Sequence, residues 1–151
     1  LKRLAQGCAS AKMKKLTMHT INYNEDDLKN ICEKYSLSLV ILHGSFAKGT
    51  STSKSDIDLG LLGDTPVINK NYFDILKDIA SIFGDKLDPV FINGAEAMIT
   101  RNVALNGIPL YERAKGLFNS FKVTALARYM DTKKFRILEK QYIKSVVEKE
   151  I

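Results

Sequence analysis

Hydrophobic positions recur along much of the chain at the spacing of amphipathic helices. The apolar residues from Leu28 to Tyr35 follow this spacing, and Asn24 with the three acids after it is typical of a helix start, which predicts a helix over residues 24–36. The same spacing predicts helices over residues 71–83 and 95–106, and from residue 116 onward with a break near residues 131–132. The chain is therefore expected to be rich in helices with one apolar face.

Short apolar runs between these helices predict the strands of a sheet. Residues 39–43 form a continuous apolar run, as expected of a strand buried on both faces. The other predicted strands are residues 56–62, residues 87–92 and a short edge strand at residues 110–111. Because strands and helices alternate, the predicted fold class is α/β, a small mixed sheet flanked by helices with a helical C-terminus.

Composition narrows the class of protein. A chain of 151 residues is expected to form one domain, and 45% hydrophobic with 26% charged residues is ordinary for a soluble protein. No apolar run is long enough to cross a membrane, and none follows the lysine-rich start as in a signal peptide, which favours a cytoplasmic protein. Cys8 and Cys32 form no metal-binding pair, and His19 and His43 are too isolated for zinc. We expect His43 to be a hydrogen-bonded structural histidine.

Charge is distributed unevenly along the chain. Residues 1–18 carry five basic and no acidic side chains, residues 19–112 carry eight basic and thirteen acidic ones, and residues 113–151 carry ten basic and four acidic ones. We expect a basic N-terminal extension at 1–18, an acidic core at 19–112 and a basic helical region of the same domain at 113–151. An acidic core suits divalent cations, and basic ends suit an acidic partner, although lysines that only solvate helix ends give the same pattern.

The basic C-terminal region also carries an apolar stripe. Its members recur at helical spacing and are Phe118, Phe121, Ala125, Leu126, Phe135, Leu138, Tyr142 and Val146. Such a stripe is usually part of a core, and near a chain end it can also pack on a partner.

The most informative segment is residues 43–62, HGSFAKGTSTSKSDIDLGLL, which joins the first two strands through a loop rich in Gly, Ser and Thr. Gly44 and Gly49 lack side chains that would keep a phosphate from the backbone, and the backbone N–H groups and the Ser45 hydroxyl are expected to bind its oxygens. Lys48 adds a positive charge beside them. A Walker P-loop is excluded, because no lysine follows the second glycine.

Three aspartates complete the candidate chemistry. Asp56 and Asp58 lie two apart on a predicted strand, so both side chains leave the same face, and such mutually repelling carboxylates suit Mg²⁺. Asp88 at the start of the third strand joins them if that strand lies beside the second, and it is the natural general base in a two-metal nucleotidyl transfer. An exposed strand end and a turn acid beside Pro89 are the simpler alternatives. Pro89 predicts that the third strand bends or lies at a sheet edge.

The Gly-Ser pair at residue 44, ten intervening residues and the Asp-Ile-Asp at residue 56 resemble the signature of the polymerase-β-type nucleotidyltransferase superfamily, in particular its minimal nucleotidyltransferase family. Similarity continues through LDPVFIN, ALNGIPLYE and loosely ARYMDTKKF, so it covers most of residues 24–135. The resemblance implies the polymerase-β-type fold, ATP as the nucleotide donor and Mg²⁺ as the cofactor. It implies a triphosphate bound by Gly44 and Ser45, metal bound by Asp56 and Asp58, and a nucleophile activated by Asp88, which also binds metal.

The same resemblance implies a partner. Members of the minimal family are commonly encoded beside HEPN-domain ribonuclease toxins, which they neutralise by adenylylating a tyrosine. This chain lacks the arginine–histidine motif of such toxins, so it resembles the antitoxin, an enzyme that transfers AMP from ATP to a HEPN toxin. Transfer to a small molecule such as an aminoglycoside, and an antitoxin that acts by binding alone, remain as alternatives. A membrane or nucleic-acid partner is not expected, and a homo- or hetero-oligomer is left open.

Overall fold

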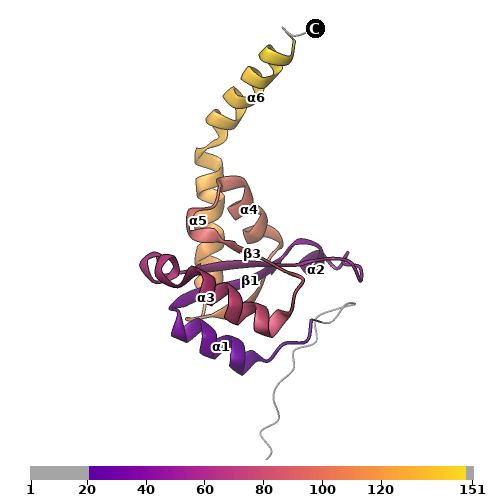
Figure 1. Ribbon diagram of the computed structural model, residues 1–151. Helices are drawn as coiled ribbons and strands as arrows, with labels where there is room; N and C mark the ends of the chain where they lie inside the picture. Colours follow the sequence, from indigo (N-terminus) through magenta and orange to yellow (C-terminus); the bar gives the residue numbers. More distant parts are fainter. Residues whose placement is uncertain (1–20, 149–151) are drawn as a thin grey trace, which may run out of the picture.

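The computed structural model describes residues 21–148, which form one four-stranded sheet with helices on both faces (Figure 1). The strands lie in the order β3-β2-β1-β4. Their bounds are β1 Leu37–His43, β2 Ile57–Gly63, β3 Leu87–Phe91 and β4 Ile108–Glu112. β1 pairs antiparallel with both β2 and β4, and β2 pairs parallel with β3. The predicted α/β class with a mixed sheet is confirmed, and all four predicted strands are present.

Helices occupy most of the remaining chain. Their bounds are α1 Glu25–Lys34, α2 Gly44–Lys48, α3 Thr65–Phe83, α4 Ala97–Asn106, α5 Leu117–Asp131 and α6 Lys133–Val147, with a 3-10 turn, η1, at Ile92–Gly94. Between residues 21 and 148, no helix combines the length and apolar character that a membrane crossing requires. The basic extension predicted at residues 1–18 lies outside the described part of the chain.

The core has two halves, one on each face of the sheet. The central strand β1 supplies both, because successive side chains of a strand point to opposite faces. Val40 and Leu42 are buried against α1 and α3, whereas Leu39 and Ile41 are buried with Val103 of α4 and with the first turn of α5. Burial on both faces explains why the sequence of β1 is a continuous apolar run.

The sequence predicted the start of α1 correctly and the start of α3 incorrectly. α1 begins as predicted, because the Asn24 Oδ1 accepts a hydrogen bond of 2.9 Å from the Asp26 backbone N–H. α3 begins at Thr65, six residues before its predicted start, with Pro66 in its first turn. Asn71, the predicted start, has non-helical angles (φ −116°, ψ 22°) inside this helix. The apolar periodicity therefore located the second, straight part of α3 and missed the turn before the kink.

β3 is an edge strand, which accounts for its proline. Pro89 aligns with Leu59 of β2, and within residues 21–148 no strand pairs with β3 on its other side. A proline cannot donate a ladder hydrogen bond, so it is tolerated at an edge. This confirms the expectation drawn from Pro89.

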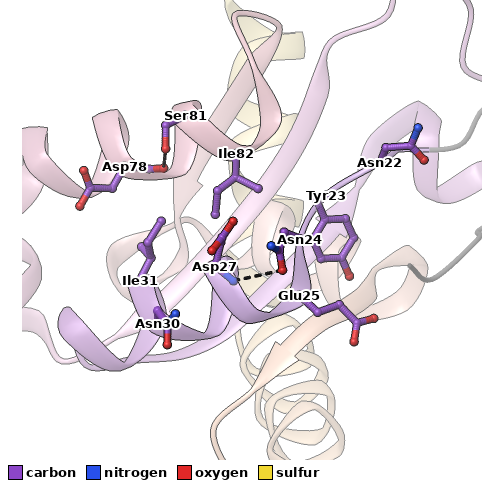
Figure 2. Close-up of a pocket in the computed structure, with 10 residues that line it drawn as sticks. All are labelled: Asn22, Tyr23, Asn24, Glu25, Asp27, Asn30, Ile31, Asp78, Ser81 and Ile82. Carbon is purple, nitrogen blue, oxygen red and sulfur yellow. Dashed lines mark hydrogen bonds between the residues drawn. The ribbon is translucent and has the colours of Figure 1, made fainter. Parts of the chain in front are cut away.

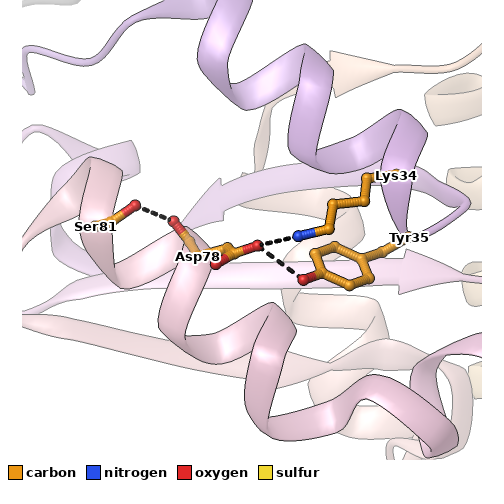
Figure 3. A network of polar contacts seen from close by, with 4 residues as sticks. All are labelled: Lys34, Tyr35, Asp78 and Ser81. Atoms are coloured by element: carbon orange, nitrogen blue, oxygen red, sulfur yellow. Dashed lines mark hydrogen bonds and ion pairs between the residues drawn. The ribbon is translucent and has the colours of Figure 1, made fainter.

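A polar network joins the end of α1 to α3 (Figure 3). The Lys34 Nζ and the Tyr35 hydroxyl both donate to Oδ2 of Asp78, at 2.9 and 2.7 Å. The hydrogen bonds from Lys34 and then Tyr35 hold the pKa of the Asp78 carboxyl below its ordinary value. Tyr35 is itself buried, so the network fixes the end of α1 against α3.

Removing this carboxylate should lower stability in a pH-dependent way. We expect Asp78→Ala to reduce the free energy of unfolding by about 1 kcal/mol at pH 7. Because the folded pKa is depressed, this stabilisation is present above the ordinary aspartate pKa of about 4 and is lost as the pH falls through the lower folded value. Urea denaturation at several pH values measures it, with the exposed Asp74→Ala on the same helix as a control. A loss that is equally large at pH 2 would contradict the role of the charge.

The C-terminal helices meet at Thr132, where the sequence predicted a break. α5 packs against the sheet and α4, and its Phe118 and Ala125 are buried. α6 extends away from the rest of the molecule (Figure 1), and none of its residues is buried. The apolar stripe is therefore core in α5, whereas its continuation in α6 lies on the surface.

Candidate active site

The predicted site residues meet at one edge of the sheet, where β1 ends and both β2 and β3 begin. His43, the last residue of β1, pairs with Asp58, and Asp58 in turn pairs with Asp88 of β3. Asp56 was predicted to begin the second strand, but it lies one position before the first residue of β2. The parallel pairing of β2 with β3 thus brings together two aspartates that lie thirty residues apart in sequence.

Gly44 lies directly against one of these carboxylates. It begins α2 with φ +67°, a backbone conformation that side chains rarely adopt. A Cβ built at this position would overlap Oδ2 of Asp58 and lie 2.7 Å from its Cγ. The missing side chain therefore makes room for the Asp58 carboxylate within the protein. The sequence had suggested only that it makes room for a phosphate.

The electrostatics of Asp58 show that the acidic groups influence one another. Burial raises the pKa of the Asp58 carboxyl above its ordinary value, and the charges of Asp88 and Asp56 raise it further. The neighbouring His43 and a backbone N–H of Ser45 lower this pKa and only partly compensate. No ion pair between described residues includes any of the three aspartates. This leaves the cluster with negative charge that a cation would neutralise.

His43 ends β1 beside this cluster, paired with Asp58. Its Nε2 is buried and has no hydrogen-bond partner among the described residues, so the expectation of a hydrogen-bonded structural histidine is wrong for this atom. Burial lowers the pKa of His43, although Asp58 and Asp88 act to raise it. The imidazole is therefore kept largely neutral close to two carboxylates.

The donor set fits a hard divalent cation in its chemistry. All three candidate ligands are carboxylate oxygens, which Mg²⁺ prefers. They do not form a ready-made cage, because no group of three or more His, Cys, Asp or Glu side chains in residues 21–148 is arranged to hold an ion. A bound cation would thus have to draw the side chains of Asp56, Asp58 and Asp88 together. The favourable free energy of binding would come from relief of the repulsion between these carboxylates.

The loop after α2 is held by contacts that the sequence did not reveal. Gly49 ends α2 in the left-handed conformation (φ 71°), which is the usual role of a glycine at a helix C-terminus. A Cβ there would meet no atom within 4 Å, so the backbone conformation and not a close contact favours glycine. Lys48 is exposed in the last turn of α2. Lys86 donates from Nζ to the Ser53 carbonyl, and the Thr52 N–H donates to Oγ of Ser55 at 2.8 Å. The Lys86 contact joins residues 33 apart, so no local sequence pattern could indicate it.

A cavity of about 710 Å³ lies elsewhere, between the start of α1 and the end of α3 (Figure 2). Figure 2 shows it lined by polar side chains such as Asn24, Asp27 and Asp78 together with Ile31 and Ile82. None of the predicted site residues lines it. We therefore place the candidate chemistry at the carboxylate cluster, although the cluster lies on an open edge of the sheet.

A family profile and a curated relative both match this chain. The profile of the family described as polymerase beta, nucleotidyltransferase matches residues 26–116. The protein adenylyltransferase MntA of Aphanizomenon flos-aquae is 28% identical over 123 residues, covering 75% of this chain and 82% of the relative.

Solved structures show the same fold. A crystal structure of a toxin–antitoxin with AMP-PNP contains a chain that matches with a TM-score of 0.62 at 22% identity, covering 82% of this chain and 98% of that one. A structure of the tri-AMPylated HEPN toxin of Shewanella oneidensis in complex with MNT antitoxin matches with a TM-score of 0.56 at 20% identity, covering 82% and 95%. At such identities the likeness establishes the fold.

The family profile spans more than half of the chain and includes every predicted site residue, from Gly44 to Asp88. The structure independently brings the glycine-serine turn and the aspartates to one edge of a mixed sheet. The chain therefore belongs to the polymerase beta nucleotidyltransferase family of enzymes.

Proposed function

We propose that this chain is a magnesium-dependent protein adenylyltransferase, which transfers AMP from ATP to a tyrosine hydroxyl of a partner HEPN toxin and so acts as its antitoxin. The observation that carries the proposal is the uncompensated carboxylate cluster of Asp56, Asp58 and Asp88 beside the Gly44–Ser45 turn. The similarity to a protein adenylyltransferase supports the transfer of AMP, and the toxin–antitoxin structures of the same fold support the class of acceptor.

Each residue has a defined role in the proposed reaction. Gly44 and Ser45 bind the triphosphate, with the exposed Lys48 and the turn at Gly49 beside them. Asp56, Asp58 and Asp88 hold Mg²⁺, which when bound neutralises phosphate charge and lowers the pKa of an attacking hydroxyl. The acceptor oxygen attacks the α-phosphorus of ATP, the bond between the α-phosphorus and the bridging oxygen breaks, and pyrophosphate leaves. Asp88, exposed at the start of an edge strand, accepts the proton of the hydroxyl.

The direct test is a labelling experiment with a candidate HEPN-domain partner protein. We expect label from ATP marked on the α-phosphate to appear on the HEPN protein, to be absent when the γ-phosphate is marked, and to be lost in EDTA. Peptide mass spectrometry should place AMP on a tyrosine. Label from the γ-phosphate would indicate a kinase. Neutralisation of the HEPN protein without any label would indicate an antitoxin that acts by binding alone.

A further inference from the structure

α6 has an exposed apolar surface that no part of the described chain covers. Phe135, Leu138 and Tyr142 are 73%, 60% and 70% exposed, and together with Val146 they lie at positions i, i+3, i+7 and i+11. This spacing places them in one row along the helix, which we call the apolar row. A row of large apolar side chains in water is costly, so it indicates a contact surface.

A second row on α6 is basic. Its members have the same spacing, offset from the apolar row by two residues, and they are Lys133, Arg136, Lys140 and Lys144. Two residues correspond to about 200° around a helix, so this basic row lies on the opposite side. The same side borders a hollow of about 460 Å³ between α5 and α6, whose charged lining residues are Lys133, Arg136 and Lys140.

α6 is fixed at its base by aromatic and hydrogen-bond contacts. The Arg136 guanidinium lies 3.6 Å from the centre of the Tyr129 ring, and the Arg101 guanidinium of α4 lies 4.8 Å from the same ring. Arg136 also donates hydrogen bonds to the Tyr129 carbonyl and to the Thr132 hydroxyl. These contacts hold the first turn of α6 relative to α4 and α5, so both rows are presented in a defined direction.

The charges on α6 select among the possible occupants. The helix has five basic residues and one acidic residue, so a second copy of this chain would bring positive charge against positive charge. A helix on a lipid surface needs its apolar face separated from its charged face, and the exposed Ile137, Ile143 and Val147 interrupt the basic side of α6, which disfavours a membrane. A protein with an apolar groove bordered by carboxylates can contact both rows at once. Charge complementarity therefore favours an acidic protein.

We propose that α6 is the docking element for the acceptor protein, which covers the apolar row with an apolar groove and the basic row with carboxylates; this rests on the proposed function. The acidic carboxylate cluster of the active site would repel such an acceptor, and the basic row offsets that repulsion. Docking on α6 thus holds the acceptor to the enzyme, while the target hydroxyl reaches the edge of the sheet.

The test compares two sets of α6 variants with matched controls on α3. The apolar-row variant carries Phe135→Ala, Leu138→Ala and Tyr142→Ala together, and its control is Phe73→Ala, which replaces a side chain that is 81% exposed. The basic-row variant carries Lys133→Glu, Lys140→Glu and Lys144→Glu, leaves Arg136 in place, and has Lys70→Glu with Lys77→Glu as its control. Because α6 buries no residue, all variants should melt within a few degrees of the wild type.

The first measurement is binding of each variant to immobilised HEPN protein in the absence of ATP. The apolar-row variant should bind about 100-fold more weakly, mainly through faster dissociation. The basic-row variant should associate about tenfold more slowly and lose most of the salt dependence of the wild-type rate. Both α3 controls should bind within about twofold of the wild type. In transfer assays the α6 variants should raise KM for the acceptor and leave kcat unchanged.

Other outcomes overturn the proposal. Wild-type binding by both α6 variants would show that the acceptor docks elsewhere. A wild-type dimer in light scattering that the apolar-row variant abolishes would assign the row to a second copy, and binding of wild type alone to phosphatidylserine vesicles would assign it to a membrane. If HEPN binding depends on α6 but the wild type transfers no AMP, the docking surface stands and the proposed function fails.

Discussion

Replacing Asp58 by asparagine should reduce AMP transfer by about 10³-fold or more without weakening the ligand-free fold. The side chain keeps its shape, so it still occupies the space beside Gly44. Its charge is lost, and with it the proposed cation site. Because burial and the neighbouring Asp88 and Asp56 raise the pKa of Asp58, ionised Asp58 is unfavourable in the folded protein at neutral pH. The metal-free melting temperature should therefore stay the same or rise.

The measurement combines the α-labelled transfer assay with calorimetric melting in EDTA. Asp56→Asn should behave in the same way, whereas Asp74→Asn, an exposed acid on α3, should change neither activity nor stability. Full activity of Asp58→Asn would remove the proposed cation site. A fall of several degrees in its metal-free melting temperature would instead assign Asp58 a structural role.

Gly44→Ala should destabilise the protein and disable the site together. The added Cβ meets the Asp58 carboxylate, and the φ of +67° is itself unfavourable for alanine. We expect a loss of about 3 kcal/mol in the free energy of unfolding, from backbone strain and from overpacking. Displacement of Asp58 should also lower AMP transfer by at least about 100-fold, because small shifts of a catalytic group are costly.

Gly49→Ala provides the matched control for this change. Gly49 has a similar φ of 71°, but an added Cβ there meets no atom within 4 Å. Gly49→Ala should lower the free energy of unfolding by about 1 kcal/mol, because only the unfavourable backbone conformation contributes. In a background with Asp58→Ala, the cost of Gly44→Ala should fall towards that of Gly49→Ala. Equal costs for Gly44→Ala in both backgrounds would show that the contact with Asp58 is unimportant.

Much of the fold could be predicted because its signals are local. The cap at Asn24, the buried run of β1 and the break at Thr132 each depend on a few neighbouring residues. The start of α3 was missed, because its first turn is interrupted at Asn71 before the apolar periodicity begins. That turn is marked only by Pro66.

The candidate site was predictable in its residue types and less so in its geometry. The spacing of Asp56 and Asp58 indicated a shared face, and the pairing of Asp58 with Asp88 required the strand order, which no spacing supplies. The contact between Gly44 and Asp58 and the unpartnered Nε2 of His43 depend on how two strands pack beside a turn. These are tertiary features without a local sequence signature.

The strand order also sets when the chain can fold during synthesis. β1 is made early but is complete only when β4 pairs with it, through contacts such as Leu39 with Glu112. Until then, one edge of the most apolar strand in the sheet presents unpaired N–H and C=O groups, the usual template for aggregation. A nascent chain that ends before Ile108 therefore cannot close its sheet, and the edge of β1 stays open until β4 emerges.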